Sequence, residues 1–364
     1  MKIHQIISYL ENIAPPALQE SYDNAGLLTG YPDWECTGAL CCLDAIEAVV
    51  DEAIQKQCNL IVAHHPIIFS GLKKITGKNY IERTIIKAIK NDIAIYAIHT
   101  NLDNIGNGVN GKIAEKLGLQ NLQILAPKTG QLCKLYFYVP AGHAAAVMNA
   151  LFEAGAGNIG NYSECSFRVN GTGTFRPNEQ ANPFTGEIGK RHEDEELKIE
   201  ILFPSWLEVR IITALKAYHP YEEVAYEVIR LNNQHQQIGA GITGEWAEAI
   251  TEDHFLQKLK DIFRLTVIKH TARTGRPVKK ISICGGAGIF LLKDAIRSKS
   301  DVYITGDVKY HEYFDADGHI LLADIGHYES EQFTIELLAN LLEQKFPNFA
   351  VLKTGVNTNP VHYF

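Results

Sequence analysis

Apolar positions along the first hundred residues follow two different periods. From Ile3 to Leu10 they recur at the three- and four-residue spacing of a helix, which predicts an amphipathic helix at the N-terminus. Short apolar runs typical of buried strands follow, and helical patterns separate them. These runs span residues 37–44, 59–66 and 93–103. The alternation of strands and helices predicts an α/β layered core.

The pattern changes near Pro127. A strand pattern at residues 134–141 leads into a helical stretch, and a polar, glycine-rich hairpin region follows. A second strand, a helical pattern at residues 206–218 and a last strand at residues 222–231 complete the segment. Two successive strand–helix–strand series are the order of a ferredoxin-like sandwich. We therefore predict an inserted ferredoxin-like α+β domain over residues 128–236.

After about residue 237 the α/β alternation resumes. The segments KKISICGGAG, DVYITGD and HILLADIGH are strand patterns that stop at glycine, aspartate or histidine. A helix pattern follows from about Tyr328 to Gln344. A chain of 364 residues is long for one domain. We predict a core domain in two halves, residues 1–127 and 237–364, on either side of the insert.

Composition and charge narrow the classes of function. With 46% hydrophobic and 21% charged residues, the chain can bury a core and lacks the signature of disorder. A formal charge of -8 argues against a broad surface for nucleic acid or an acidic membrane. No apolar run approaches the ~20 residues that span a bilayer, and the N-terminal pattern has no signal-peptide cleavage site. Because seven cysteines without a CxxC pair are typical of a reducing compartment, we expect a cytoplasmic protein.

Three predicted core strands end in residues of the kind that bind metals. His64 and His65 close the second run, Asp103 follows the third, and His327 follows the last. In open α/β sheets, sites gather at the carboxyl ends of strands. Since Pro66 ends the strand, two neighbouring histidines that would otherwise face opposite sides can approach one site. The alternatives stay open: a buried histidine beside an exposed one, and Asp103 as the N-cap of the next helix.

His327 and Glu331 stand four residues apart, on one face of the last helix pattern. Glu331 heads an apolar stripe, where a carboxylate is unusual unless it is paired or binds a metal. The alternative is favourable placement in the helix dipole. Three histidines and two carboxylates exceed what one ion takes from a protein, so we predict two divalent ions about 3.5–4 Å apart. Zinc is favoured, and iron, manganese or nickel would accept the same donors.

Two further histidines are candidate catalytic acid/base groups. His99 precedes Asp103 by four residues and could orient a metal ligand from behind. His311 lies near the end of another core strand, where a surface histidine is an equal alternative. Asp307 could either cap a helix or belong to the site, and the sequence leaves both alternatives open. Asp23 stands in SYDNAG, and a D-N-x-G string of this kind favours a turn. The segment CGGAG (284–288) lacks a full phosphate-binding motif, so a tight turn is the favoured interpretation.

Six segments, in chain order, resemble the signature blocks of the Nif-three-like family, the GTP cyclohydrolase I type 2 homologues. They are SYDNAGLLTG, AHHPIIF, HTNLD, TGDVKYHEYFDA, GHYESEQF and NTNPVHYF. The resemblance implies a dinuclear metal site, here on His64, His65, Asp103, His327 and Glu331. Long members contain an inserted domain similar to PII and CutA proteins, and HPYEEVAYEVIRL resembles its matching strand. The family also implies a toroidal homohexamer whose metal sites face an internal cavity.

Two functions fit these features. The first is a metal-dependent hydrolase, in which two metals activate a water that attacks a nucleotide-like or other small substrate. The second is a non-catalytic, metal-holding oligomer whose PII-like insert senses a ligand or recruits a partner, which is an argument from analogy of fold. A catalytic acid/base group beside the metals would discriminate between them, and His99 and His311 are the candidates.

Overall fold

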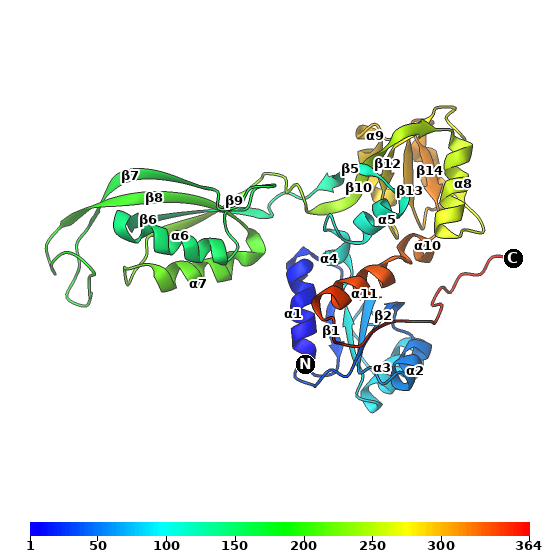
Figure 1. Ribbon diagram of the computed structural model, residues 1–364, viewed down its shortest axis with the longest axis horizontal. Helices are drawn as coiled ribbons and strands as arrows, with labels where there is room; N and C mark the ends of the chain where they lie inside the picture. Colours follow the sequence, from blue (N-terminus) through cyan, green and yellow to red (C-terminus); the bar gives the residue numbers. More distant parts are fainter. The chain divides into compact units, whose positions relative to one another are not determined.

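The computed structural model describes residues 1–364, and the chain divides into two compact units. The core unit consists of Met1–Ala126 and Gln237–Phe364, and the inserted unit is Pro127–Gln236. The core unit contains two sheets and the inserted unit contains a third (Figure 1). The molecule is therefore a mixed α/β protein with several sheets, which confirms the class predicted from the sequence.

The first sheet of the core unit has the strand order β1-β4-β3-β2-β15. Its strands are β1 (Gly26–Thr29), β2 (Ala39–Asp44), β3 (Leu60–His65), β4 (Ala94–Ala97) and β15 (Val351–Lys353). All neighbours are parallel except β1, which pairs antiparallel with β4. β2, β3 and β4 are buried along almost their whole length. Burial on both faces explains why their sequences are continuous apolar runs rather than alternating patterns.

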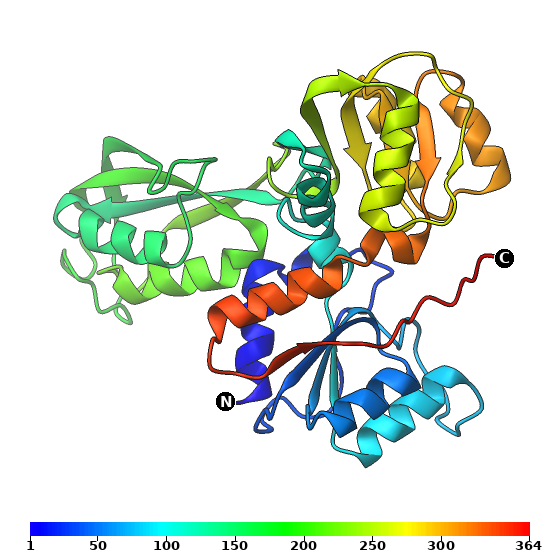
Figure 2. The same ribbon diagram turned by 45° about the vertical axis from the view of Figure 1, so that its right-hand side comes forward.

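Helices cover both faces of this first sheet. α2 (Glu47–Gln55) and α3 (Tyr80–Lys90) pack against one face as part of one hydrophobic cluster. α1 (Ile3–Ile13) and α11 (Thr334–Lys345) lie on the other face (Figures 1 and 2). Ile3 and Leu10 of α1 are fully buried, so the predicted N-terminal helix and its apolar stripe are confirmed.

The second sheet of the core unit has the strand order β11-β14-β13-β12-β10-β5. Its strands are β5 (Gln120–Pro127), β10 (Gly239–Ile250), β11 (Lys269–His270), β12 (Val278–Ile283), β13 (Val302–Thr305) and β14 (Leu321–Asp324). β12, β13 and β14 are parallel, whereas β10 and β11 pair antiparallel with β12 and β14. α9 (Leu292–Arg297) packs on this sheet through Leu292 and Ala295. α8 (Glu252–Phe263) places Phe255 against Trp246 of β10.

Short helices begin just after the parallel strands of both core sheets. α4 (Thr100–Asp103) follows β4, and α10 (His327–Glu331) follows β14. The other short segments of the core unit are α5 (Val109–Leu117) and the 3₁₀ turns η1 (Pro16–Leu18), η4 (Ile289–Leu291) and η5 (Tyr310–Ala316). Because α4 and α10 start at the carboxyl ends of strands, their side chains stand where sites form in α/β sheets.

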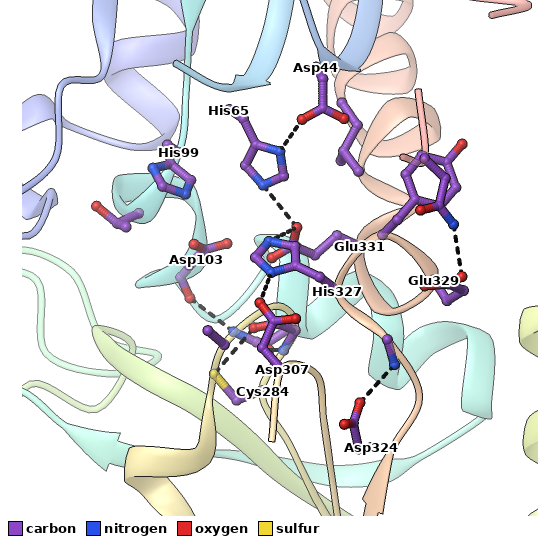
Figure 3. Close-up of a pocket in the computed structure, with 18 of the residues that line it drawn as sticks. Asp44, His65, His99, Asp103, Cys284, Asp307, Asp324, His327, Glu329 and Glu331 are labelled. Atoms are coloured by element: carbon purple, nitrogen blue, oxygen red, sulfur yellow. Dashed lines mark hydrogen bonds and ion pairs between the residues drawn. The ribbon is translucent and has the colours of Figure 1, made fainter. Parts of the chain in front are cut away.

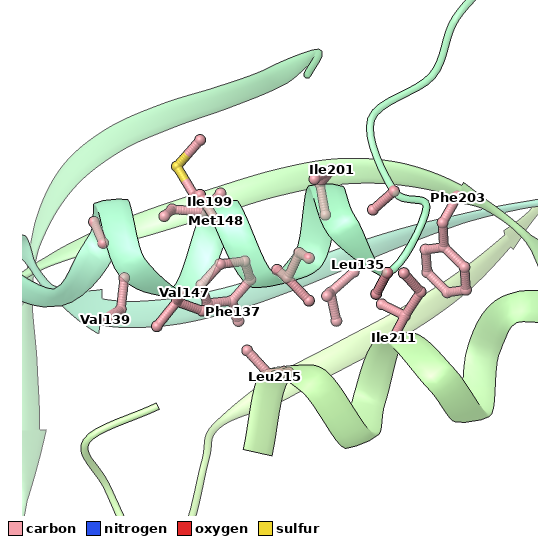
Figure 4. Close-up of a cluster of buried hydrophobic side chains, with 14 of the residues drawn as sticks. Leu135, Phe137, Val139, Val147, Met148, Ile199, Ile201, Phe203, Ile211 and Leu215 are labelled. Carbon is pink, nitrogen blue, oxygen red and sulfur yellow. The ribbon is translucent and has the colours of Figure 1, made fainter. Parts of the chain in front are cut away.

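The inserted unit is built from two strand–helix–strand series around one antiparallel sheet of order β7-β8-β6-β9. Its elements are β6 (Leu132–Pro140), η2 (Ala141–His143), α6 (Ala144–Glu153), β7 (Ser166–Phe175), β8 (His192–Pro204), η3 (Ser205–Leu207), α7 (Glu208–Tyr218) and β9 (Tyr226–Leu231). Alternate residues of β6 are buried. Leu135 and Phe137, on this buried face, pack with Val147 of α6 and Leu215 of α7 into one hydrophobic core (Figure 4). Both helices therefore cover the same face of the sheet.

Two further features concern the helices and the cysteines of the whole chain. No helix has both the length and the apolar character needed to cross a membrane. All seven cysteines are free thiols, and Cys41, Cys42 and Cys284 are buried. These three behave as small core residues, as their apolar sequence context predicts.

Candidate metal centre

A cavity of about 920 Å³ lies in the core unit and is lined by residues from both of its sheets. Asp44 and His65 end β2 and β3, Asp103 ends α4, and Asp324 ends β14. The carboxyl ends of parallel strands meet at one edge of a sheet, which brings Asp44 and His65 side by side. Asp103 and Asp324 line the same cavity from the other elements. Figure 3 shows histidine and carboxylate side chains from both halves of the chain converging on the same space.

His64 and His65 are the last two residues of β3. His64 is fully buried, and its Nδ1 lies 2.9 Å from the carbonyl oxygen of Ile98. His65 Nδ1 lies 2.8 Å from Oδ1 of Asp44, at the end of the neighbouring strand. The two rings are nonetheless adjacent, with centroids 4.8 Å apart, because the strand ends before Pro66. Both imidazoles are fixed at Nδ1, which leaves Nε2 as the nitrogen available to a ligand.

His99 lies between β4 and α4 and joins these two histidines. Its ring centroid is 5.2 Å from that of His64 and 5.3 Å from that of His65. His99 Nδ1 is 2.8 Å from Oδ1 of Asp23, whose Oδ2 accepts a hydrogen bond from the backbone N–H of Thr100. Burial would raise the pKa of Asp23, but these hydrogen bonds lower it to about 2. Asp23 is therefore a carboxylate that fixes the His99 ring, and not only a turn residue.

His327 and Glu331 begin and end α10, one turn apart. His327 Nδ1 lies 2.7 Å from Oδ2 of Asp307, and its Nε2 lies 3.2 Å from Oε2 of Glu331. The same Oε2 lies 3.0 Å from His65 Nε2, whereas Oε1 lies 4.0 Å from His64 Nε2. Glu331 thus connects the two halves of the chain, with one oxygen toward His65 and His327 and the other toward His64.

Asp103 completes the group beside His64. Its Oδ1 lies 3.6 Å from His64 Nε2, a nitrogen that is buried and has no hydrogen-bond partner. A buried polar atom left unpaired costs about 1–3 kcal/mol. Burial and the nearby carboxylate of Glu331 raise the pKa of Asp103 well above its usual range. An unpaired imidazole nitrogen that faces a carboxylate at this distance is the arrangement that a metal ion would bridge.

The carboxylates of this cluster raise the pKa values of the histidines beside them. Burial would lower the pKa of His65, but Asp44 and Glu331 raise it to about 10. Burial would likewise lower the pKa of His327, but Glu331 and Asp307 raise it to about 9. Glu331 responds in the opposite sense: burial would raise its pKa, but His327 and His65 hold it well below its usual range. Two imidazoles therefore carry extra protons at neutral pH where a cation would otherwise balance the carboxylates.

Two overlapping groups of side chains could hold a metal ion. They are His64, His65 and His99, and His65, His327 and Glu331. In each group the potential ligand atoms lie within 4.8 Å of one another. Imidazole and carboxylate suit zinc, iron, manganese and nickel. Metal-binding histidines usually have their second ring nitrogen bonded to a carboxylate or carbonyl, which is the case for each histidine here. The residues present fit a divalent metal.

The CGGAG segment (284–288) makes room for Glu331. Gly286 has a φ of +63°, and a Cβ at this position would lie 2.3 Å from Oε1 of Glu331. The N–H groups of Gly285 and Gly286 donate to the side chains of Asn110 and Ser330. Because these amides are already bonded, the segment acts as a tight turn that lets the carboxylate approach and not as a phosphate cradle.

Residues near the C-terminus line the cavity and support its ligands. The hydroxyl of Thr358 donates to Oδ2 of Asp44 at 2.6 Å. Asn359 Nδ2 and the hydroxyl of Tyr363 bond to Oε1 of Glu329, at 2.8 and 3.2 Å. Thr358 thus fixes the second oxygen of the carboxylate that orients His65, while Glu329 is bonded away from the imidazoles.

The structure brings together the five residues predicted as metal ligands and adds His99 to them. His311 is exposed on η5 and does not line the cavity. Sequence reasoning missed Asp44, favoured a turn for Asp23 and left Asp307 open, although each of these carboxylates bonds to a histidine Nδ1. The available signal was positional, since Asp44 is the polar residue that ends an otherwise apolar strand pattern.

Comparison with known proteins finds relatives that match from end to end. The model of the family Duf34/NIF3 (NGG1p interacting factor 3) matches residues 1–360. The chain is 39% identical to the GTP cyclohydrolase 1 type 2 homolog of Halalkalibacterium halodurans, over 98% of this chain and 97% of the relative. It is 38% identical to the protein of the same name from Bacillus subtilis, with the same coverage.

Solved structures agree with these relatives. The Bacillus cereus protein related to NIF3 superimposes with a TM-score of 0.88 at 38% identity, over 100% of this chain and 99% of that one. A Staphylococcus aureus protein superimposes with a TM-score of 0.79 at 31% identity, with the same coverage. Sequence and structure thus match over the core unit and the inserted unit alike, and the chain belongs to the Duf34/NIF3 family.

Proposed function

We propose that this chain binds two divalent metal ions in the core-unit cavity and acts as a metal-dependent hydrolase on a nucleotide-like or other small substrate. The observation that carries the proposal is the convergence of three imidazoles, those of His64, His65 and His327, on the carboxylates of Glu331 and Asp103. The ring of His99 lies beside those of His64 and His65, and all four imidazoles are bonded at Nδ1. Two relatives bear the name GTP cyclohydrolase 1 type 2 homolog, which supports the same class of reaction.

Glu331 is the proposed bridging ligand, because its two oxygens face different histidines. One ion would be held by His65 and His327, and the other by His64 and Asp103. A catalytic ion usually keeps a position for water or substrate, and this set of donors is small enough to leave one at each ion. Zinc is favoured, with iron, manganese and nickel as the alternatives that the same donors accept.

Bound metals would lower the pKa of a coordinated water and polarise the bond to be broken. The protein's own contribution is to orient the proton carriers beside that water. Asp23 holds His99 at Nδ1, so His99 Nε2 is free to accept or donate a proton within the cluster. We therefore propose His99 as the acid/base group. His311 does not line the cavity, and its catalytic role stays a prediction.

The walls of the cavity support a flat, nucleotide-like substrate. Tyr22, Phe69 and Phe290 line it, and their side chains are 63%, 50% and 65% exposed. Exposed aromatic rings beside a charged centre can stack on a planar base while the metals hold oxygen atoms of the substrate. The volume of about 920 Å³ lies in the range of small-molecule sites.

Metal analysis and an activity screen test the proposal together. Protein purified after metal-replete expression should hold about two ions per chain. The loaded protein should then hydrolyse at least one of a panel of nucleotides, phosphoesters and small amides, and turnover should stop when the metals are removed. His99→Gln is expected to keep its metals and lose turnover, which separates an acid/base role from a ligand role.

Each part of the proposal can fail separately. A metal content near zero in wild-type protein would contradict the metal site. A full metal content with no turnover on any substrate class would contradict the hydrolase and favour the non-catalytic function. Turnover that survives metal removal would belong to a contaminant or to another site.

We also propose that the chain assembles into a toroidal homohexamer with its metal sites facing an internal cavity. Membership of the Duf34/NIF3 family supports this assembly. Light scattering on the purified full chain should give a mass about six times the 40.5 kDa of one chain. A monomeric or dimeric mass across the tested concentrations would contradict the hexamer.

The second candidate function rests on the inserted unit, which we propose is a ferredoxin-like domain of the PII and CutA kind. Its element order, strand–helix–strand twice, and its sheet order β7-β8-β6-β9 support this. In this function the chain is a non-catalytic, metal-binding oligomer that senses a ligand through the insert. The observation that favours such a role is a cavity of about 600 Å³ within the inserted unit.

A further inference from the structure

The cavity of the inserted unit lies on the face of its sheet opposite α6 and α7. Glu196 and Lys198 of β8 line it, whereas the alternate residues Ile199 and Ile201 belong to the hydrophobic core under the helices. The loop segments 177–184 and 221–225 contribute the remaining sides. The cavity is therefore built from one unit alone and is separate from the metal centre.

Two glycines shape the floor of this cavity. Gly171 pairs with Glu196 in the β7–β8 ladder and Gly173 pairs with Asp194, so both face the cavity side of the sheet. A Cβ at Gly173 would lie 2.1 Å from Oε2 of Glu196, whereas a Cβ at Gly171 would meet nothing within 4 Å. The carboxylate of Glu196 thus lies over Gly173, and the space above Gly171 is open.

Aromatic rings form the walls above this floor. The ring centroid of Tyr221 is 6.1 Å from that of Phe175 and 6.1 Å from that of Phe184. Tyr138 lines the cavity from β6. The faces of aromatic rings carry partial negative charge and attract cations within about 6 Å of the ring centroid. Three rings at these separations can contact one charged group together.

Acidic residues outnumber basic ones around the same space. Glu196, Glu222 and Glu223 line the cavity, and Lys198 is the only basic lining residue. The ammonium of Lys198 lies 4.6 Å from the ring centroid of Tyr136 and 3.8 Å from Oε1 of Glu200, and neither of these partners lines the cavity. The charge of Lys198 is thus engaged outside the cavity, and the local field disfavours an anionic ligand.

The hydroxyl of Tyr221 is buried in this setting and makes no hydrogen bond of normal geometry. Burial raises the pKa of Tyr221, and the carboxylates of Glu196 and Asp194 raise it further, so the hydroxyl stays neutral. The backbone N–H of Tyr221 donates to Nδ1 of His219 at 3.1 Å, and His219 Nε2 donates to the carbonyl of Tyr138 at 2.8 Å. With both ring nitrogens engaged, His219 fixes Tyr221 in place and is not itself a metal ligand.

We propose that this cavity is a binding site for an organic cation, an ammonium or guanidinium group carried on an apolar body. Glu196 supplies the opposite charge, the rings of Phe175, Phe184 and Tyr221 surround the charged group, and the Tyr221 hydroxyl accepts one of its hydrogen bonds. The apolar body occupies the open floor above Gly171. The volume of about 600 Å³ suits a ligand of metabolite size.

Three probes of one shape and different charge test the proposal: 2-phenylethylammonium, 2-phenylethanol and phenylacetate at pH 7. Their binding to the full-length protein is measured by saturation-transfer NMR and by calorimetry. The ammonium should bind best, the alcohol about tenfold more weakly and the carboxylate least, because the three share a phenyl ring on a two-carbon chain and differ in the charge of the polar group. Equal binding of the alcohol and the ammonium, tighter binding of phenylacetate, or no saturable ammonium binding would overturn the proposal.

Two variants locate the binding in this cavity. Gly171→Leu fills the open floor without backbone strain and should abolish binding of the ammonium and the alcohol alike. Glu196→Gln should weaken the ammonium about tenfold and leave the alcohol unchanged. The matched controls are Gly142→Leu, another glycine with open space around its Cβ, and Glu195→Gln on the other face of β8, and both should bind normally. Ammonium binding that survives Gly171→Leu would place the ligand elsewhere.

Discussion

Replacement of Glu331 by alanine is expected to remove both metal ions from the protein. The two carboxylate oxygens serve different parts of the cluster: Oε2 lies 3.0 Å from His65 and 3.2 Å from His327, and Oε1 lies 4.0 Å from His64. A bridging carboxylate belongs to both ions, so its loss weakens both at once. Metal analysis of the purified variant should give a background level, against about two ions per chain in the wild type.

Glu329→Gln is the matched control for this experiment. Glu329 lies on the same short helix, two residues earlier, but bonds to Asn359 and Tyr363 instead of the imidazoles. This variant should keep its full metal content. Glu331→Gln is the second test variant, because it keeps the shape of the side chain and removes only the charge. If folded Glu331→Gln protein, checked by circular dichroism, kept both ions, the bridging role would be wrong.

Replacement of Asp44, the carboxylate that orients His65, should reduce metal affinity less than loss of a metal ligand does. Asp44→Asn leaves His65 in place but replaces the carboxylate oxygen that lies 2.8 Å from its Nδ1. Loss of such a partner typically reduces metal affinity by roughly 10–100-fold. In a competition with a chelator of known affinity, Asp44→Asn should therefore release metal more readily than the wild type and less readily than Glu331→Ala.

The sequence was sufficient for the elements that local pattern controls. The strands that end at His65 and just before His99 are buried on both faces, so their apolar runs were recognisable without knowledge of their partners. Glu331 was recognisable because a carboxylate at the head of an apolar helix stripe needs a reason to be buried. Each of these features can be predicted from residues within the same strand or the same helical turn.

The outer carboxylates could not be assigned in the same way, because their partners are far away in the chain. Asp23 bonds to His99, 76 residues later, and Asp307 bonds to His327 across the end of two strands. A single Asp in a D-N-x-G string is explained equally well by a turn. His311 was placed near the site by its position after a strand, but η5 carries its side chain to the surface.

Metal-free protein is expected to lose stability as the pH rises above about 6.5, whereas metal-loaded protein is not. In the folded cluster the pKa of His65 is raised to about 10 and that of His327 to about 9, against about 6.5 in the unfolded chain. A group whose pKa rises on folding stabilises the folded chain fully when the pH is below its pKa in the unfolded chain. This contribution is lost as the pH rises toward its pKa in the folded chain. The raised pKa of Asp103 acts in the same direction.

Below about pH 6.5, His64 has the opposite effect on the stability of the metal-free protein. Burial lowers the pKa of His64 to about 3, so below about pH 6.5 the unfolded chain takes up a proton that the folded chain refuses. Asp103, which the raised pKa keeps protonated in the folded chain, acts with the opposite sign between about pH 4 and 6.5. The two effects offset there, so the stability of the metal-free cluster should change little over that interval. The range above pH 6.5 is the better test, because there His65, His327 and Asp103 all lower the stability of the metal-free protein as the pH rises.

The free energy of unfolding of chelator-treated protein should fall by roughly 3 kcal/mol between about pH 6.5 and 8.5, with the half-exposed His327 discounted for solvent screening. Zinc competes with protons for the same imidazole nitrogens, so zinc-loaded protein should hold or gain stability over that interval. Denaturant unfolding of both forms at the two pH values measures the difference. A metal-free protein that is equally stable at both would mean that His65 and His327 do not carry the extra protons, and that the carboxylates around them do not create the negative site a metal would neutralise.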